Sequence, residues 1–259
     1  MELNKDLVIK LRDLYGDAFY LLDSYQFKKN FNEVKRIFSS IYSNFNIAYS
    51  YKTNYTPKLC KIVNELGGYA EVVSEMELEL ALKCGVLPKN IIWNGPIKNL
   101  QKLEEYLLKG VTANIDTLDE AEYINKISEK YKVVLNVGIR CNYDVNDGVI
   151  SRFGLDVDGD DFLKVLSIVN NSNYLHFVNF QCHFAKRNVE YWPARAKGMV
   201  ALLERLNIIP ERIDIGGGLF GKMEDSLKAQ FSTKIIMTMH LLQQLYLLIT
   251  LKIKSLNLN

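Results

Sequence analysis

The sequence predicts an α/β fold built around a parallel sheet, and three observations support this prediction. Short apolar runs alternate with segments in which apolar residues recur every three or four positions, from residue 17 to residue 215. Parallel strands joined by helical crossovers produce this alternation. The 259 residues suffice for one large domain or a barrel, which typically needs about 250 residues. The composition, 48% hydrophobic and 24% charged, is that of an ordinary globular protein.

Two elements are predicted ahead of the lysine at position 52. Residues 18–22 form an apolar run that predicts a strand, and apolar residues at helical spacing predict a helix over residues 27–41. An extended run then leads from Ile47 to Lys52, which places this lysine at the C-terminal end of a predicted strand. Pro57 predicts the start of the next helix, because proline is favoured in the first turn.

From residue 47 onward the alternation predicts seven strands and the helices between them. Two helices begin with a capping box, in which a hydroxyl residue precedes a glutamate by three positions: Ser74 with Glu77, and Thr117 with Glu120. The predicted strands cover residues 47–52, 70–73, 91–93, 112–115, 133–139, 177–182 and 212–215. The predicted helices cover residues 57–66, 74–85, 100–108, 117–127, 161–169 and 192–206. The alternation fits an open or a closed sheet, and closure into an eight-stranded barrel needs one strand more.

Charge and cysteine use argue against several classes of partner. The formal net charge of +2 argues against nucleic acid or a membrane surface as the main partner. The N-terminus lacks the basic and apolar regions of a signal peptide, which predicts a cytoplasmic protein. The cysteines are scattered without a C-x-x-C pair, so we expect reduced thiols and no metal site: Cys60, Cys84, Cys141 and Cys182.

The last residues differ in composition from the rest of the chain. No acidic residue follows Asp225, no glycine follows Gly221, and residues 235–251 contain no Lys, Arg, Asp or Glu. This uncharged stretch is shorter than the roughly 20 residues of a membrane span, and it contains His240 and two glutamines. The sequence therefore predicts an atypical tail over residues 232–259, which a frameshift would explain, rather than a membrane anchor.

Four features at the ends of predicted strands can carry chemistry. Lys52 presents an amine on rigid backbone, and a buried lysine loses its proton readily and can form an imine. The triplet Gly216-Gly217-Gly218 can offer consecutive backbone N–H groups to a phosphate. His183 can lie flat against a cofactor ring, and Arg152 can pair with a phenolate or a carboxylate. Each feature also has an ordinary structural alternative: a surface lysine, a tight turn, a core histidine and a loop arginine.

Six short motifs along residues 17–221 agree in order and approximate spacing with one known family. They are Tyr49-Ser50-Tyr51-Lys52-Thr53-Asn54, Glu71-Val72-Val73-Ser74-x-x-Glu77-Leu78, Asn94-Gly95-Pro96-Ile97-Lys98, Ser151-Arg152-Phe153-Gly154, Cys182-His183 and Asp214-Ile215-Gly216-Gly217-Gly218. Together they resemble the ornithine/diaminopimelate decarboxylase family, the pyridoxal-phosphate enzymes with an alanine-racemase-like barrel. The resemblance implies a (β/α)8-type TIM barrel.

The resemblance also implies a role for each candidate residue. Lys52 would form the internal aldimine with pyridoxal 5'-phosphate, His183 would stack on one face of the pyridine ring, and Arg152 would lie near the ring and its phenolic oxygen. Backbone amides of the glycine triplet would hold the phosphate, and the second-strand motif would support the site. These remaining cofactor-binding residues are expected to be Gly216, Gly217, Gly218, Ser74 and Glu77.

The reaction and the domain organisation follow from the same resemblance. It implies a lyase of lysine or polyamine biosynthesis that removes the carboxylate of an amino acid or diamino acid as CO2. Full-length members are expected to be homodimers. Residues 23–231 are predicted to form the barrel that binds the cofactor, and residues 1–22 correspond to a segment that pairs with a C-terminal β-domain in the family.

The chain departs from the family pattern in two places. Ala185-Lys186-Arg187 stands where the family has a Gly-Ser pair that helps to bind the phosphate. The family's eighth strand, with its Glu-Pro-Gly-Arg block, and its β-domain have no counterpart here. We therefore expect an incomplete barrel that binds the cofactor poorly and does not complete the dimer's active site; whether this chain is active stays open. Two alternatives stay open: a pyridoxal-phosphate carrier without catalysis, and an amino-acid racemase on the same barrel.

Overall fold

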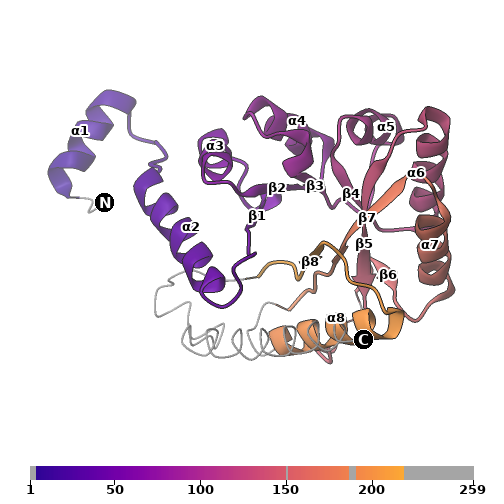
Figure 1. Ribbon diagram of the computed structural model, residues 1–259. Helices are drawn as coiled ribbons and strands as arrows, with labels where there is room; N and C mark the ends of the chain where they lie inside the picture. Colours follow the sequence, from indigo (N-terminus) through magenta and orange to yellow (C-terminus); the bar gives the residue numbers. More distant parts are fainter. Residues whose placement is uncertain (1–3, 150, 187–190, 219–259) are drawn as a thin grey trace.

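A curled parallel sheet forms the centre of the molecule (Figure 1). The computed structural model describes residues 4–149, 151–186 and 191–218. In these residues seven strands lie in the order β1-β2-β3-β4-β5-β7-β8, all neighbours are parallel, and the two-residue β6 pairs with β5. The strands are β1 (Ala48–Ser50), β2 (Tyr69–Val72), β3 (Ile91–Trp93), β4 (Thr112–Ile115), β5 (Leu135–Asn142), β6 (Leu155–Asp156), β7 (Leu175–Gln181) and β8 (Arg212–Asp214).

Helices between the strands cover the outer side of this sheet (Figure 1). The arrangement confirms the predicted α/β fold and the incomplete barrel, since no pairing joins β1 to β8 among the described residues. The helices are α1 (Lys5–Tyr15), α2 (Ser24–Ser39), η1 (Tyr51–Thr53), α3 (Pro57–Glu65), α4 (Glu75–Lys83), η2 (Pro88–Asn90), α5 (Leu100–Leu108), α6 (Leu118–Tyr131), α7 (Asp160–Asn171) and α8 (Trp192–Leu206).

Local sequence explains where many of these helices begin. Pro57 occupies the start of α3, where its missing N–H costs no hydrogen bond. Five other helices begin after a side chain that accepts a hydrogen bond from a backbone N–H of the first turn, which satisfies a donor that the helix leaves open. These capping residues are Asn4, Asp23, Ser74, Asn99 and Thr117.

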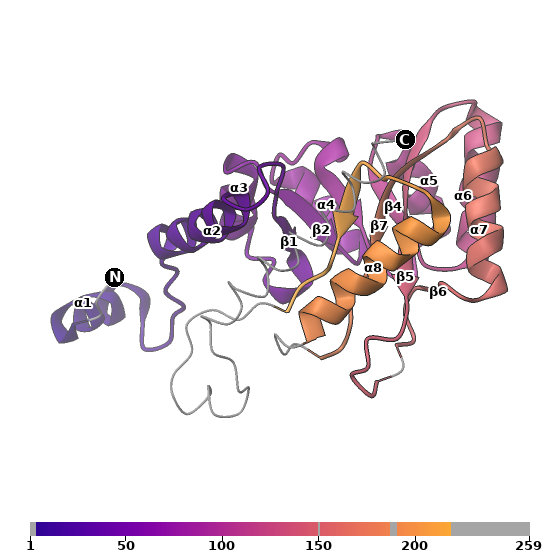
Figure 2. The same cartoon turned by 60° about the horizontal axis from the view of Figure 1, so that its bottom comes forward.

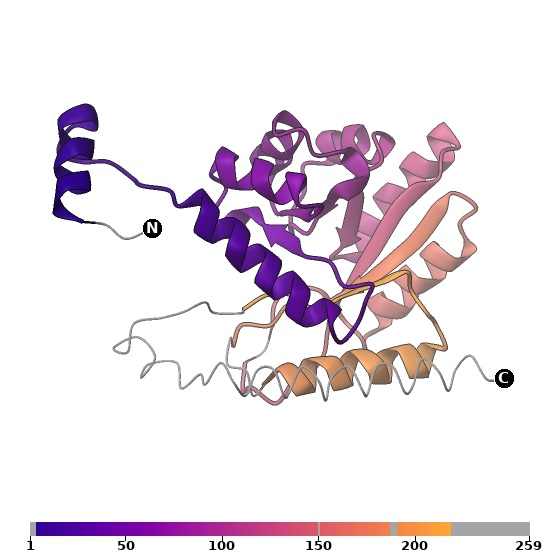
Figure 3. The same cartoon turned by 60° about the vertical axis from the view of Figure 1, so that its left-hand side comes forward.

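The predicted strand over residues 18–22 is wrong. These residues have no regular secondary structure and connect α1 to α2. A strand needs a hydrogen-bonding neighbour, and none of the described strands pairs with this segment. Figure 3 shows α1 and the connecting segment standing away from the sheet. The apolar run therefore marks an exposed segment of the described chain and not an element of its sheet.

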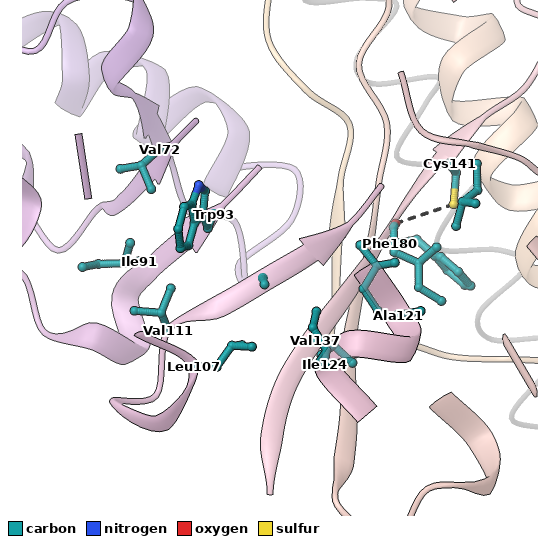
Figure 4. Packing of buried hydrophobic residues seen from close by; sticks show 14 of the residues in the cluster. Val72, Ile91, Trp93, Leu107, Val111, Ala121, Ile124, Val137, Cys141 and Phe180 are labelled. Carbon is teal, nitrogen blue, oxygen red and sulfur yellow. Dashed lines mark hydrogen bonds between the residues drawn. The ribbon is translucent and has the colours of Figure 1, made fainter. Parts of the chain in front are cut away.

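The core lies between the sheet and the helices that cover it (Figure 4). All residues of β3 and β4 are buried, as expected for the central strands of a curled parallel sheet. Leu107 of α5 and Ile124 of α6 belong to the same buried cluster, and Figure 4 shows Leu107 near Val111 and Ile124 near Val137 of β5. Removing these side chains from water is the main stabilising contribution to the fold. The four cysteines are buried and unpaired, which agrees with the prediction of packed thiols.

Helix α8 lies beside β5 and β8 at the end of the described chain (Figure 2). Gly198 lets the ring of Tyr143 approach the helix closely, because a Cβ at this position would clash with the ring. Trp192, at the first turn of α8, packs against Ile215 after β8. These contacts fix the helix against the segments that follow β5 and β8.

Some predictions concern residues that the structure does not describe. The predicted tail over residues 232–259 lies outside the described residues, as do residues 219–231 of the predicted barrel. Within the described ranges, none of the helices combines the length and the apolar character that crossing a membrane requires.

Candidate active site

Lys52 lies at the carboxyl end of β1, in the single turn η1. Its neighbour Tyr51 is buried and anchors this turn in the core. The Nζ atom of Lys52 lies 3.8 Å from Oε1 of Glu71 on β2, and the two side chains are 41% and 9% exposed. A partly exposed amine thus faces a buried carboxylate. The carboxyl ends of parallel strands are where α/β enzymes place their reactive groups.

A second carboxylate approaches this amine from the other end of the sheet. Asp214 ends β8, and burial is the main cause that raises its pKa to about 6. The negative charge of Glu71 also raises this pKa, whereas a hydrogen bond from Gly216 and the positive charge of Lys52 lower it. Because Glu71 and Lys52 both act on Asp214, the curled sheet brings the ends of β1 and β8 within electrostatic reach of each other.

The glycine triplet after β8 forms a turn that is tied to His183. Gly216 has a φ of +73°, a left-handed conformation that favours glycine. Its N–H donates to Oδ1 of Asp214 (2.8 Å), and the N–H of Gly217 donates to Nδ1 of His183 (3.3 Å). A Cβ on Gly217 would meet no atom within 4 Å, so this turn has open space on one side. The structure therefore brings the candidate phosphate and ring contacts together, and their roles stay predictions.

A buried arginine on α8 holds this turn from behind. Arg195 is 1% exposed, its Nη1 donates to the carbonyl oxygen of Gly217 (3.0 Å), and its Nη2 donates to that of Lys186. Burial lowers the pKa of Arg195, and the ring centre of Trp192 lies 5.0 Å from its guanidinium carbon. One guanidinium group thus joins the glycine turn to the segment after His183, where the sequence lacks the family's Gly-Ser pair.

We expect Gly216→Ala to disturb this turn and Gly217→Ala to leave it intact. A Cβ on residue 216 would lie 2.5 Å from the carbonyl oxygen of Cys182 and 2.8 Å from Nδ1 of His183. The left-handed backbone alone costs an alanine about 1–2 kcal/mol. Urea unfolding should show at least this loss for Gly216→Ala, and a change within about 0.5 kcal/mol for Gly217→Ala. Equal losses in the two variants would contradict the crowded surroundings of Gly216.

Ser74 and Glu77 form the predicted capping box at the start of α4. Oγ of Ser74 accepts from the N–H of Glu77 (3.3 Å), and Oε2 of Glu77 accepts from the N–H of Val73 (2.8 Å). Glu77 is buried, and this burial is the main cause of its raised pKa. Thr117 and Glu120 repeat the arrangement at the start of α6. The contacts of Ser74 and Glu77 fix the backbone after β2, and their part in cofactor binding stays a prediction.

Arg152 is exposed, and its guanidinium carbon lies 5.1 Å from the ring centre of Phe153. A different arginine is buried in the sheet: Nη1 of Arg140, on β5, lies 3.1 Å from Oδ2 of Asp116. Asp116 also accepts from the N–H of Gly154 (2.8 Å), so this ion pair holds the loop that carries Arg152. The described contacts do not join Arg152 to the other candidate residues. The sequence motifs do not single out Arg140, although a charge within an apolar strand is a usable signal.

A set of asparagines inside the sheet is likewise absent from the sequence motifs, apart from Asn94. Asn114 on β4 and Asn179 on β7 are buried, and so is Asn94, which follows β3. Burying an amide costs free energy unless it is hydrogen-bonded. A polar residue in the middle of an apolar strand is therefore the sequence signal that points to these positions.

Comparison with known proteins assigns this fold and site to a family. Residues 25–247 match the family model described as "Pyridoxal-dependent decarboxylase, pyridoxal binding domain". The chain belongs to this decarboxylase family. The match includes Lys52, His183 and the glycine triplet, so the residues gathered at the sheet edge all lie within the pyridoxal binding domain.

The chain is similar to several diaminopimelate decarboxylases. It is 28% identical over 234 residues to the "Diaminopimelate decarboxylase" of Methanocaldococcus jannaschii, which covers 82% of this chain and 52% of that protein. It is also 28% identical over 225 residues to the "Diaminopimelate decarboxylase" of Aquifex aeolicus, and this match covers 81% of this chain and 52% of that protein. A crystal structure of the M. jannaschii enzyme shares the fold with a TM-score of 0.78 at 24% identity, covering 96% of this chain and 60% of that one. The chain spans about half the length of the curated relatives it matches.

Pyridoxal phosphate is the cofactor of this domain, and the described residues fit it. Lys52 offers a partly exposed amine, as attachment of an aldehyde requires. The open side of Gly217 leaves room for a phosphate, and the buried guanidinium of Arg195 places positive charge behind the turn. In the described ranges, His, Cys, Asp and Glu side chains do not gather in a group that could hold a metal ion.

Proposed function

We propose that this chain is the cofactor-binding barrel of a decarboxylase that acts on diaminopimelate. The observation that carries the proposal is the amine of Lys52, held beside Glu71 and within electrostatic reach of Asp214, whose carboxylate caps the glycine turn. The substrate is suggested by the relatives, which are named diaminopimelate decarboxylases. A solved structure of one such enzyme contains L-lysine, which is what remains when diaminopimelate loses one carboxylate as CO2.

The residues of this chain have distinct parts in that reaction. When bound, pyridoxal phosphate supplies an electron sink for the negative charge left at the substrate carbon as CO2 departs. Lys52 would hold the cofactor through Nζ, and Glu71 would balance the charge of that nitrogen. The turn at Gly217 would bind the phosphate on its open side; because the N–H of Gly216 donates to Asp214 and that of Gly217 to His183, the Gly217 N–H would have to exchange His183 for the phosphate. His183, hydrogen-bonded to the same turn, would cover one face of the ring.

The pathway, the location and the partners of this protein follow from the proposed reaction and from its family. We propose a role in lysine biosynthesis, because lysine is the proposed product, and a cytoplasmic location. We also propose that residues 1–22 contact a β-domain and that the working enzyme is a homodimer. The exposed apolar side chains before α2 support such a contact, because contiguous exposed apolar residues mark interaction surfaces. They include Phe19, Tyr20, Leu21 and Leu22.

Release of labelled CO2 tests the proposed function. The protein is incubated with pyridoxal phosphate and, in turn, with diaminopimelate, ornithine, arginine or lysine radiolabelled at the α-carboxylate. Release from diaminopimelate alone supports the proposal, and release from another substrate only would replace the proposed substrate. Retained cofactor without any CO2 would favour the carrier alternative, and loss of substrate chirality without CO2 would favour the racemase. Titration of the protein with pyridoxal phosphate measures the weak cofactor binding that the departures in sequence predict.

A further inference from the structure

A row of buried amides crosses the inside of the sheet and ends at Glu71. Nδ2 of Asn94 donates to Oε1 of Glu71 (3.3 Å), and Nδ2 of Asn114 donates to Oδ1 of Asn94. Nδ2 of Asn179 in turn donates to Oδ1 of Asn114 (3.0 Å). The exposed fractions of Glu71, Asn94, Asn114 and Asn179 are 7%, 5%, 0% and 2%. The row therefore connects β2, the end of β3, β4 and β7 without contact with bulk water.

The chemistry of a carboxylate sets the direction of this row. An ionised Glu71 can only accept hydrogen bonds, so Asn94 must turn its NH2 group toward Glu71 and its carbonyl oxygen toward Asn114. The same reasoning then orients Asn114 and Asn179. All three amide dipoles consequently point their positive ends toward Glu71. Aligned hydrogen bonds in a medium of low dielectric constant polarise and strengthen one another.

Gly138 on β5 makes the crossing possible. Strand β5 lies between β4 and β7, and a register shift between Val137 and Gly138 places Gly138 opposite Asn179. A Cβ on Gly138 would clash with Oδ1 of Asn114 and would lie 2.6 Å from both amide atoms of Asn179. Glycine inside a strand weakens it, and it commonly marks a close approach of other groups. Here the approaching groups are the two amides, which meet across the strand.

Stability alone does not account for the row. Replacing hydrogen-bonded buried partners by apolar groups of the same shape is often neutral or stabilising. The row is also incompletely satisfied, since Oδ1 of Asn179 is buried without a hydrogen-bond partner among the described residues. What the amides provide, and apolar side chains cannot, is a set of oriented donors that ends on one carboxylate.

The charges around Glu71 show why such donors matter. Glu77 from α4 and Asp214 from β8 are like charges that act on Glu71, and the amine of Lys52 from η1 is the opposite charge. Like charges repel the Glu71 carboxylate and Lys52 attracts it, whereas the hydrogen bond from Asn94 fixes one of its oxygens. The row of amides therefore holds the carboxylate in one orientation among these charges.

We propose that Asn94, Asn114 and Asn179 are positioning residues that hold the Glu71 carboxylate in one orientation, aimed at Lys52. This inference deepens the proposed function and rests on it only for the role of Lys52. In the apo protein, the row fixes Glu71 before any ligand binds. Gly138 is part of the same arrangement, because a residue without a side chain at this position lets the row cross β5.

Carbon NMR of the glutamate carboxylates tests this inference. The protein is labelled at the side-chain carboxyl carbon of glutamate, and Glu71→Gln identifies the resonance of Glu71. Asn114→Leu and Gly138→Ala interrupt the row at two points without altering Glu71 or Lys52. At one fixed pH we expect the Glu71 resonance to move and to broaden in both variants, because the carboxylate loses the row of donors that holds it in one orientation. The control Ser128→Ala removes a buried hydroxyl on α6, outside the row, and should leave the Glu71 resonance unchanged.

An unchanged Glu71 resonance in the row variants, or an equal change in Ser128→Ala, would overturn the inference. Asn179→Ala is measured beside Asn114→Leu, because it removes only the far end of the row and is less disruptive to folding. The measurement needs no cofactor and is therefore independent of turnover. A shifted Glu71 resonance without CO2 release would reject the proposed function alone, and CO2 release with an unmoved resonance would reject the role of the amides alone.

Discussion

Lys52→Met should abolish the covalent attachment of pyridoxal phosphate. Methionine keeps most of the length and the apolar stem of the side chain but removes the amine that faces Glu71. Borohydride reduction followed by peptide mass spectrometry should find the cofactor on Lys52 in the wild-type protein and on no peptide of the variant. Release of CO2 from diaminopimelate should fall to the level of the protein without cofactor, because the amine that holds the cofactor is gone.

Lys58→Met is the matched control for this substitution. Lys58 lies on α3, close to Lys52 in the sequence, and its side chain is exposed to solvent. This variant should retain the cofactor on Lys52 and keep its activity. Labelling of Lys58 in the wild-type protein, or a labelled Lys52→Met variant, would show that the site is assigned to the wrong lysine.

Elements with local signals could be predicted from the sequence. The strands predicted at residues 91–93 and 112–115 and the helices predicted at 100–108 and 192–206 have the same limits in the structure. The capping boxes locate the starts of α4 and α6, because their side chains bond to backbone within the first turn. The place of Lys52 is equally local, since it needs only an extended run and the proline that begins α3.

Contacts between distant strands could not be predicted in this way. Asn179 meets Asn114 across β5 because a register shift places Gly138 between them, and no single strand encodes that register. The choice of Arg140 over Arg152 as the buried arginine also depends on how the sheet curls. Residues 18–22 fail for a related reason, since an apolar run becomes a strand only where a neighbouring strand pairs with it.

Lys98→Met should lower the unfolding free energy by about 3–5 kcal/mol at neutral pH, the usual cost of leaving a buried charge unpaired. Nζ of Lys98 lies 2.6 Å from Oε1 of Glu120, and the two side chains are 1% and 9% exposed. The same Nζ donates to the carbonyl oxygen of Asn114 (2.8 Å), so the pair also ties α6 to β4. Urea unfolding of the variant and the wild-type protein measures the loss.

Two further variants show whether the buried charge causes this loss. Lys102→Met breaks an exposed pair with Glu105 and should have a far smaller effect, because exposed pairs contribute little to stability. The double variant Lys98→Met/Glu120→Gln should recover most of the loss, because it leaves no buried charge. Glutamine at position 120 can still accept the hydrogen bond that the N–H of Asp116 donates to Glu120.

The pH dependence separates a lost charge from lost packing. Burial raises the pKa of Glu120, and Lys98 is the main group that lowers it, so Lys98→Met should raise this pKa further above its unfolded value of about 4.3. A carboxyl group with a raised pKa stabilises the folded state below its unfolded pKa, and this contribution is lost as the pH rises through the folded pKa. Relative to the wild-type protein, Lys98→Met should therefore be most stable at about pH 4 and lose stability toward pH 7. A difference that does not vary with pH would mean that the variant loses packing, and that the ion pair with Glu120 is not what Lys98 contributes.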